Sequence, residues 1–260
     1  MFNKPLANSL DKLINLRHLT FGSFFDKPLA NSLDQLANLT FLSLGVEFNQ
    51  SLSNSLDKLR NLTIIIFSDK FNQPLTNSLD KLINLTQITF GYSFNKPLAN
   101  SLNKLTNLSL LFFGVEFNKP LANSLDKLIN LNHITFGYKF DQPLSETLCY
   151  LKKLSHLTLG CNFSHQLNLH PNIKILTLES NNQYIIDSLP NSIEELNFGE
   201  YFVLPLDNLP NSIKKMSFDR ESCYNNPLNN LPKLLEILTL PISYKFKIHL
   251  QIVKYLIIIK

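Results

Sequence analysis

The sequence of 260 residues contains no tryptophan and only two methionines, seven glycines and three cysteines. Three irregularly spaced cysteines, Cys149, Cys161 and Cys223, favour free thiols in a reducing compartment over a disulfide framework. No stretch typical of a secretory signal follows Met1, and no apolar run approaches the roughly 20 residues that span a bilayer. These absences predict an intracellular, cytoplasmic protein that makes no membrane contact.

Motifs for catalysis and for cofactor binding are also missing. Neither a G-x-x-x-x-G-K-[ST] loop nor a G-x-G-x-x-G loop occurs, and no nucleophile is paired with a base in a recognisable pattern. The net charge of +4 is only a weak argument for nucleic-acid binding. Lys is enriched together with Asn, Ile, Phe and Leu, which is the composition that an AT-rich coding sequence favours. We therefore expect no enzyme, no cofactor and no nucleic-acid partner.

The most prominent feature of the sequence is an internal repeat. Seven copies of F-N-x-P-L-x-N-S-L-x-x-L-x-N-L-x-x-L-x-F-G-x-x fill residues 2–162, and about five shorter, more divergent copies fill residues 163–260. Phenylalanine recurs every 23 residues, at Phe2, Phe25, Phe48, Phe71, Phe94, Phe117, Phe140 and Phe163. Because no copy can bury its apolar face alone, the copies must stack around a common core. The repeat predicts a single domain over residues 1–260.

Each copy contains one predicted strand and one predicted outer turn. The segment L-x-x-L-x-F, as in residues 85–90, alternates apolar and polar side chains and predicts a half-buried strand of five or six residues. The segment N-S-L-x-x-L, as in residues 77–82, predicts a short N-capped helical or 3-10 turn. The predicted fold is an α/β-type, leucine-rich-repeat-like solenoid. It has one parallel strand per turn on the concave face and a short helical, 3-10 or irregular outer side.

The repeated motifs resemble a known family. FNQPL at residues 71–75, FNKPL at 94–98 and 117–121, and LPNSIEELNFG at 189–199 are similar to the FNIP repeat, a leucine-rich-repeat relative of amoebae and of giant viruses that infect them. The resemblance implies a scaffold for protein–protein interaction. Some similar proteins carry an F-box ahead of the repeats and act as ubiquitin-ligase adaptors. Here the repeats begin at residue 2, so we expect no F-box. The alternatives are the substrate-recognition part of such an adaptor and a decayed or truncated array without a specific function.

Outward-facing strand positions vary between copies, and such variation on a fixed scaffold can encode a partner. One of the two outward positions of each strand holds Thr or Ser in most copies, but in three copies bulky apolar residues occupy one or both of the two positions. These residues are Phe41, Ile64, Ile66, Leu110 and Phe112. With strands about 4.8 Å apart, they would span roughly 14 Å of the concave face. We predict that they bind a partner protein or peptide, and the alternative is drift in a decaying array.

Other recurring residues have simpler interpretations. His133 and His156 should be neighbours on adjacent strands and are included in the predicted partner-binding surface, but no Cys or carboxylate at ligand spacing accompanies them, so we expect no metal site. Columns of Asn and Gly are interpreted as turn residues that satisfy or relax the backbone. They include Asn15, Asn38, Asn61, Asn84, Asn107, Asn130, Gly45, Gly91 and Gly114. Neither end shows a polar cap, so end-to-end self-association is a further hypothesis.

Overall fold

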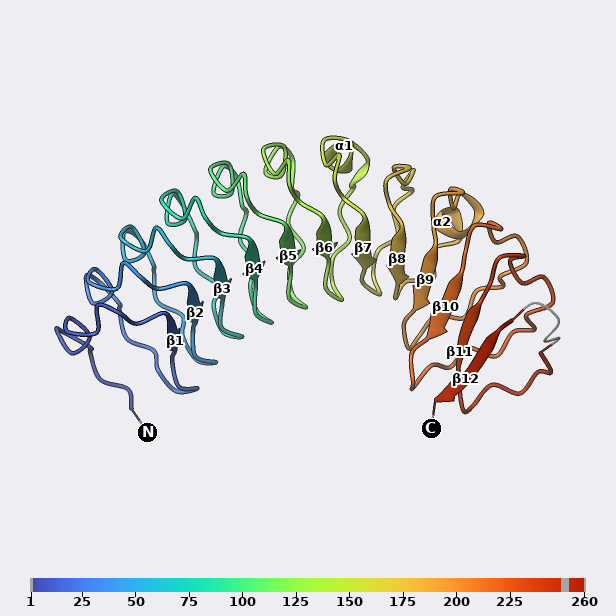
Figure 1. The fold of residues 1–260 in the computed structure, drawn as a ribbon, viewed down its shortest axis with the longest axis horizontal. Coiled ribbons are helices and arrows are strands. Elements are labelled where there is room, and N and C mark those ends of the chain that lie inside the picture. The colour runs from blue at the N-terminus through green and yellow to red at the C-terminus, as the bar shows by residue number, and fades with distance from the viewer. Residues whose placement is uncertain (1, 249–252, 260) are drawn as a thin grey trace.

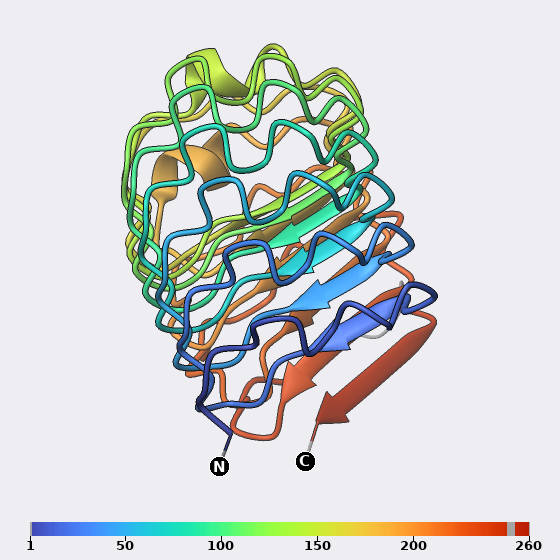
Figure 2. The ribbon, with the colours of Figure 1, turned by 90° about the vertical axis from the view of Figure 1, so that its left-hand side faces the viewer.

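The computed structural model describes residues 2–248 and 253–259, in which the chain winds into an arch of stacked coils (Figure 1). We call one strand together with the coil that leads to it a rung. Twelve strands form one parallel sheet in chain order along the inner, concave side of the arch. A view along the stack shows the rungs superimposed, with the strands on one side (Figure 2). The predicted leucine-rich-repeat-like solenoid is therefore confirmed.

The secondary structure is short and regular. The strands are β1 (His18–Thr20), β2 (Phe41–Ser43), β3 (Ile64–Ile66), β4 (Gln87–Thr89), β5 (Leu110–Phe112), β6 (His133–Thr135), β7 (His156–Leu159), β8 (Ile175–Leu178), β9 (Glu195–Phe198), β10 (Lys215–Phe218), β11 (Ile237–Pro241) and β12 (Tyr255–Ile259). The helices are α1 (Ser145–Leu148) and α2 (Gln183–Asp187). Neither helix has the length or the hydropathy to span a bilayer, and no other helix is present in the described ranges.

The strand register follows the repeat period. Leu42 pairs with Ile65 and Ile65 pairs with Ile88, so each partner lies 23 residues further along the chain. The step shortens after β7, where Leu157 pairs with Leu176 across 19 residues. Equivalent positions of successive copies therefore form columns across the sheet, as the repeat predicted.

The strands themselves are shorter than predicted. Only three residues in each of β1 to β6 are strand, instead of five or six. The reason is visible where β2 begins: the backbone N–H groups of Thr40 and Phe41 both donate to the carbonyl of Arg17, at 2.8 and 3.0 Å. Two donors on one carbonyl end the regular ladder, in which each carbonyl receives one. The same double contact recurs on the carbonyls of Thr40 and Thr63.

The core contains two columns of aromatic rings. The eight phenylalanines of the 23-residue period stack in order, with ring centroids 6.0–6.5 Å apart. A second column at the strand ends packs against the first, as in Phe90 with Phe94 and Phe113 with Phe117, both at 4.1 Å. Buried leucines fill the remaining core positions. The predicted alignment of the phenylalanines is confirmed.

The outer side consists of tight turns rather than helices in the first six rungs. Backbone hydrogen bonds run from Ser9 N–H to the Leu6 carbonyl and from Leu13 N–H to the Leu10 carbonyl, three residues back in each case. These bonds are isolated and do not follow one another residue by residue, so the irregular alternative of the prediction holds there. Helices replace these turns at α1 and α2, and the Asn182 side chain caps α2 by accepting from the Ile185 N–H.

Residues with left-handed backbone recur in these outer turns. Ala7, Ala30, Ser53, Ala99 and Ala122, which follow the Pro-Leu or Ser-Leu pair of the repeat, have φ between 34° and 45°. Alanine is strained in this region because its Cβ crowds the following carbonyl, at about 1–2 kcal/mol per residue. This strain cannot be predicted from the sequence pattern, because alanine is an ordinary helix former.

We predict that Ala99→Gly raises the free energy of unfolding by up to about 1 kcal/mol. Relief of about 1–2 kcal/mol of strain exceeds the roughly 0.5–1 kcal/mol that glycine loses through its greater freedom in the unfolded chain. Urea denaturation measures the change. Ala37→Gly is the control: Ala37 is exposed and its φ is not positive, so the same substitution should destabilise there. Destabilisation by both variants would contradict the assignment of strain.

Glycines after the strands are required by close packing between rungs. No glycine has a positive φ, but a Cβ on Gly114 would overlap the carbonyl oxygen of Gly91 in the preceding rung. Gly137 meets Gly114 in the same way. Gly22, in the first rung, has nothing within 4 Å of the position that its Cβ would take. These glycines therefore set how closely successive rungs approach.

We predict that Gly114→Ala lowers the free energy of unfolding by about 1–3 kcal/mol, because overpacking against backbone cannot relax by a side-chain rotation. Gly22→Ala is the matched control and should leave the stability within about 0.5 kcal/mol of the original. Thermal unfolding followed by circular dichroism compares the two. Equal effects at both positions would show that spacing between rungs is not what requires glycine.

Candidate partner-binding surface

The predicted outward columns lie side by side on the concave face. One column runs Phe41, Ile64, Gln87, Leu110 and His133, each paired in register with the next. The second column runs Ser43, Ile66, Thr89, Phe112 and Thr135 in the same way. We call Phe41, Ile64, Ile66, Leu110 and Phe112 the concave patch. The structure therefore brings these residues onto one face, over strands β2 to β5.

Burial within the concave patch is greater than for isolated surface side chains. All five residues are half-buried, because each is flanked by its column neighbours. Phe41 meets the ring of His18 edge-on at 5.7 Å, and Phe112 meets His133 edge-on at 5.0 Å. Gln87 and Thr89 on β4 interrupt the patch, and the Gln87 side-chain amide donates to Thr89 Oγ1 at 3.3 Å. The patch consists of two apolar groups with a polar strip between them.

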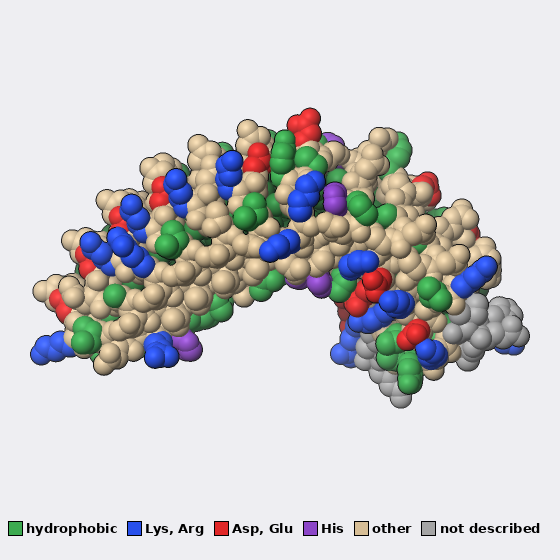
Figure 3. Space-filling model, turned by 45° about the horizontal axis from the view of Figure 1, so that its top comes forward, with side chains coloured by type: hydrophobic (Ala, Val, Ile, Leu, Met, Phe, Trp, Pro, Cys, Tyr) green, Lys and Arg blue, Asp and Glu red, His purple; other side chains and the backbone are tan. Residues whose placement is uncertain are grey.

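The face around the patch carries almost no charge. Outward strand positions from β2 to β8 hold no Lys, Arg, Asp or Glu. Glu195 and Lys215, on β9 and β10, form an ion pair at 2.9 Å and so compensate each other. Charged side chains gather instead on the outer turns, where basic and acidic groups follow one another along the arch (Figure 3).

The two predicted histidines are in contact. His133 and His156 stack with ring centroids 5.3 Å apart, and His156 Nδ1 lies 2.7 Å from the Ser155 hydroxyl. Burial, and secondly the neighbouring His156, lower the pKa of His133 below its usual value. Within the described ranges no group of three or more His, Cys, Asp or Glu side chains could hold a metal ion.

We predict that the lowered pKa of His133 makes the fold less stable in acid. The unfolded chain takes up the His133 proton at about pH 6.5, before the folded chain does, so stability is full above that pH and falls as the pH drops through this window. His133→Gln should therefore lose less stability than the original protein between about pH 7 and about pH 5. Urea midpoints at the two pH values measure this. Parallel losses in both proteins would contradict it.

None of the three thiols lies in a disulfide. One of them, the Cys161 thiol, has low reactivity. Cys161 Sγ donates to the Glu179 carboxylate at 3.7 Å. Burial, followed by the charge of Glu179, raises the pKa of the Cys161 thiol to about 11. A thiol of this pKa forms little thiolate near neutral pH and is a poor nucleophile.

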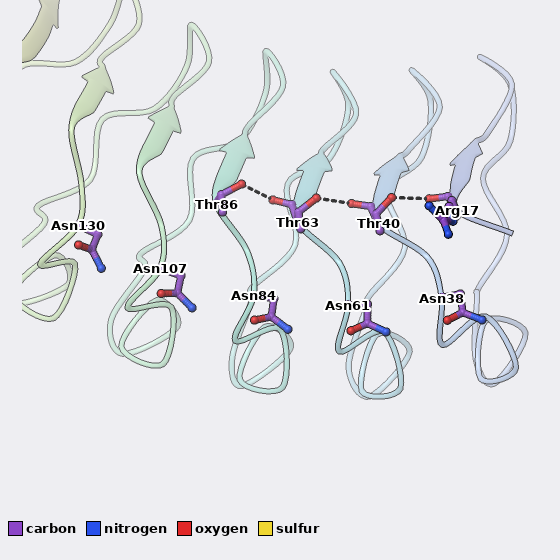
Figure 4. A pocket seen from close by; sticks show the side chains of 9 residues that line it. All are labelled: Arg17, Asn38, Thr40, Asn61, Thr63, Asn84, Thr86, Asn107 and Asn130. Atoms are coloured by element: carbon purple, nitrogen blue, oxygen red, sulfur yellow. Dashed lines mark hydrogen bonds between the residues drawn. The ribbon is translucent and has the colours of Figure 1, made fainter. Parts of the chain in front are cut away.

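A groove borders the concave patch at the side where the strands begin. It has a volume of about 620 Å³ and is lined by Arg17, Thr40, Thr63, Thr86, Asn38, Asn61, Asn84, Asn107 and Asn130 (Figure 4). We call it the Asn–Thr groove. Each Asn donates its side-chain amide to a backbone carbonyl of the preceding rung, as from Asn61 to Ala37 at 3.0 Å and from Asn84 to Arg60 at 2.9 Å. The structural interpretation of this Asn column is confirmed, but the groove beside it was not foreseen.

A second ladder of polar side chains was also missed. The residue after each of the first seven phenylalanines of the period accepts a backbone N–H from the next rung through its side-chain oxygen. Examples are Asn49 to the N–H of Asn72 at 2.9 Å and Asn95 to the N–H of Asn118 at 3.0 Å. The signal for this ladder in the sequence was the F-N pair of the repeat. An Asn at that position looks like an ordinary turn residue, and its bond to the next rung is seen only when the rungs are stacked.

Comparisons agree with this architecture. Residues 165–201 match the family model described as FNIP Repeat. The chain therefore contains an FNIP repeat in this segment. No curated protein sequence matches it. Among solved structures it is similar to CroV588, a circular leucine-rich-repeat protein of a giant virus, at 27% identity and a TM-score of 0.70. That match covers 99% of this chain and 42% of CroV588, so the chain spans less than half of that relative.

More distant similarities concern the fold alone. The structure of the Toll–Spatzle complex from Drosophila matches at 17% identity and a TM-score of 0.61, over 88% of this chain and 35% of the other chain. The TLR13–ssRNA13 complex matches at 15% identity and a TM-score of 0.57, over 95% of this chain and 47% of that one. The repeat fold is generally a non-catalytic scaffold for interaction.

Proposed function

We propose that this protein is a non-catalytic scaffold that binds a partner protein on its concave face. The anchors are the residues of the concave patch, with His133 and His156 beside them. The observation that carries the proposal is that bulky apolar side chains occupy outward positions in register on β2, β3 and β5 of one sheet face, where Ile66 and Phe112 also replace the Thr or Ser of their column. Apolar groups gathered on an otherwise polar surface are typical of an interaction site.

The geometry of the patch describes the partner that would fit. Four strands from β2 to β5 extend over about 14 Å at the usual strand spacing of about 4.8 Å. Two apolar side chains of a partner could contact the two apolar groups, while a polar atom between them meets Gln87. Because the neutral face offers no cations to phosphate groups, a protein is favoured over a nucleic acid, although an RNA complex exists for TLR13.

The proposal takes residues 1–260 as one repeat domain, supported by the unbroken strand order from β1 to β12. An intracellular location is part of the same proposal and is supported by the three free thiols. End-to-end self-association is not included. The first rung carries Lys4, Lys12 and Arg17 against one acidic residue, and the last carries Lys245, Lys247 and Lys254, so like charges would meet.

Proximity labelling in the native cell tests the proposal. We expect that Phe41→Thr, Ile64→Thr and Phe112→Thr together abolish capture of a specific protein, while the circular dichroism spectrum is unchanged. Each truncated anchor removes apolar contact worth roughly 1 kcal/mol or more, so the loss should exceed about a hundredfold in affinity. Threonine suits strands and already occupies Thr89 and Thr135 in the same sheet face.

The control replaces three exposed isoleucines of the outer side, Ile14, Ile83 and Ile129, by threonine. Capture that survives the concave triple substitution, or is lost equally in the control, would refute the proposed surface. The identity of the captured proteins separates the alternatives. Ubiquitin-ligase subunits would favour the adaptor role, and no specific capture at all would favour a decayed array.

A further inference from the structure

Two histidines border the concave patch where it ends at β5. His133 is in register with Leu110 and meets the ring of Phe112, and His156 follows on β7. We infer that these two histidines make partner binding on the concave patch sensitive to pH. When both rings are neutral they extend the apolar surface that the partner covers, and when they are protonated they exclude an apolar partner. The inference rests on the proposed function and names a control of the same site.

The rings of Phe112, His133 and His156 form a continuous row on the concave face. The ring centroids of Phe112 and His133 lie 5.0 Å apart in an edge-on contact. His133 stacks on His156 at 5.3 Å, with an angle of 22° between the ring planes. All three side chains are half-buried. A partner side chain that packs on Phe112 therefore also shields His133 from water.

The hydrogen bonds around His156 suit a neutral ring. The Asn132 side-chain amide donates to Ser155 Oγ at 2.9 Å, which leaves the Ser155 hydroxyl hydrogen for His156 Nδ1 at 2.7 Å. In this arrangement Nδ1 accepts a hydrogen bond, which only an unprotonated ring nitrogen can do. His133 Nε2 lies 3.2 Å from the Thr135 hydroxyl, which is also uncharged. Both rings thus have hydroxyl partners and no carboxylate partner.

No opposite charge offsets a proton on either ring. The outward residues beside the pair on β5 and β7 are uncharged, and they are Leu110, Phe112 and Thr158. Among the residues that the structure describes, neither His133 nor His156 lies within ion-pair distance of a carboxylate. Two positive rings stacked in this place would repel each other without compensation.

The cations in the segments before β7 and β8 are bound to other groups. Lys153 Nζ donates to Asn130 Oδ1 at 2.7 Å, and Lys174 Nζ pairs with Glu194 at 3.2 Å. Neither lysine brings a carboxylate to the histidines. The charge state of the pair is therefore set by burial and by the two rings themselves.

The sign of the effect follows from which state takes up protons first. Burial, and secondly the neighbouring His156, lower the pKa of His133. A partner that covers the rings removes more water and disfavours their charged forms further. The free protein therefore binds protons at a higher pH than the complex does. Affinity is full above the usual histidine value of about 6.5 and falls as the pH drops below it.

Nuclear magnetic resonance on the isolated protein tests the histidine pair without a partner. Between about pH 8 and about pH 5, ring signals of Phe112 should move with the same midpoint as those of His133. His156→Gln removes the repelling neighbour and should raise the His133 midpoint. His18→Gln is the matched control, because His18 meets Phe41 edge-on at 5.7 Å on the same face without stacking on a histidine. It should leave the His133 midpoint unchanged.

Binding at two pH values tests the effect on the partner, with the protein identified by proximity labelling as the purified probe. Its affinity should fall about tenfold or more between about pH 7.5 and about pH 5.5. Combining His133→Gln with His156→Gln should reduce that ratio to about threefold or less, whereas His18→Gln should keep it. Circular dichroism at the lower pH shows whether each variant is still folded.

Three results would overturn the inference. They are a Phe112 ring that does not respond to the titration of His133, a His133 midpoint that His156→Gln leaves unchanged, and an affinity ratio that is absent in the original protein or persists in the double variant. Failure of the proposed function gives a different result. Capture at about pH 7.5 would then survive the triple substitution of the concave patch, whatever its dependence on pH.

Discussion

The direct stacking of each rung's backbone on the backbone of the next is the constraint on which the whole molecule depends. It is built from three kinds of contact that repeat with the chain period. Phenylalanine rings stack inside the core, Asn side chains bind the backbone of neighbouring rungs, and glycines let carbonyls approach where any Cβ would collide. Because every contact joins equivalent positions of neighbours, an error in one rung shifts the register of the next. This explains why the first seven copies keep so strict a length.

Much of this repeated arrangement can be predicted from the sequence. Residues that recur at a fixed period occupy equivalent positions in successive rungs and therefore form columns. The parallel strands, the aligned phenylalanines and the structural role of the Asn38 type of residue all follow from that step. Strand length does not follow, because each strand begins only where two N–H groups converge on a single carbonyl of the neighbouring rung, a contact that the stacked rungs create. The left-handed alanines are hidden for a similar reason: stacking imposes a backbone conformation that alanine does not itself prefer.

The candidate surfaces could also be predicted from the sequence only in part. Alternation along a strand predicts which side chains face outward, so Phe41, Ile64 and Phe112 could be placed on one face from the sequence. Their half-burial, and the strip of Gln87 between the two apolar groups, depend on neighbouring columns that only the folded sheet brings together. The Asn–Thr groove is hidden for another reason. The Asn residues of the groove already have a structural role that the sequence pattern explains. The pattern therefore does not indicate that the remaining lone pairs line a continuous groove.

The aromatic stack is not continuous along the arch. It runs from Phe2 to Phe163, and a second block of rings begins at Phe198 and Phe202, with no ring contact joining the two blocks in the described part of the chain. Between Phe163 and Phe198 the core is filled by aliphatic side chains, which include Ile185 and Ile186 of α2. In a quasi-one-dimensional array, cooperativity passes only between neighbours. From β8 to β9, cooperativity therefore passes from one ring stack to the other through the sheet ladder and aliphatic packing, without ring-on-ring contact.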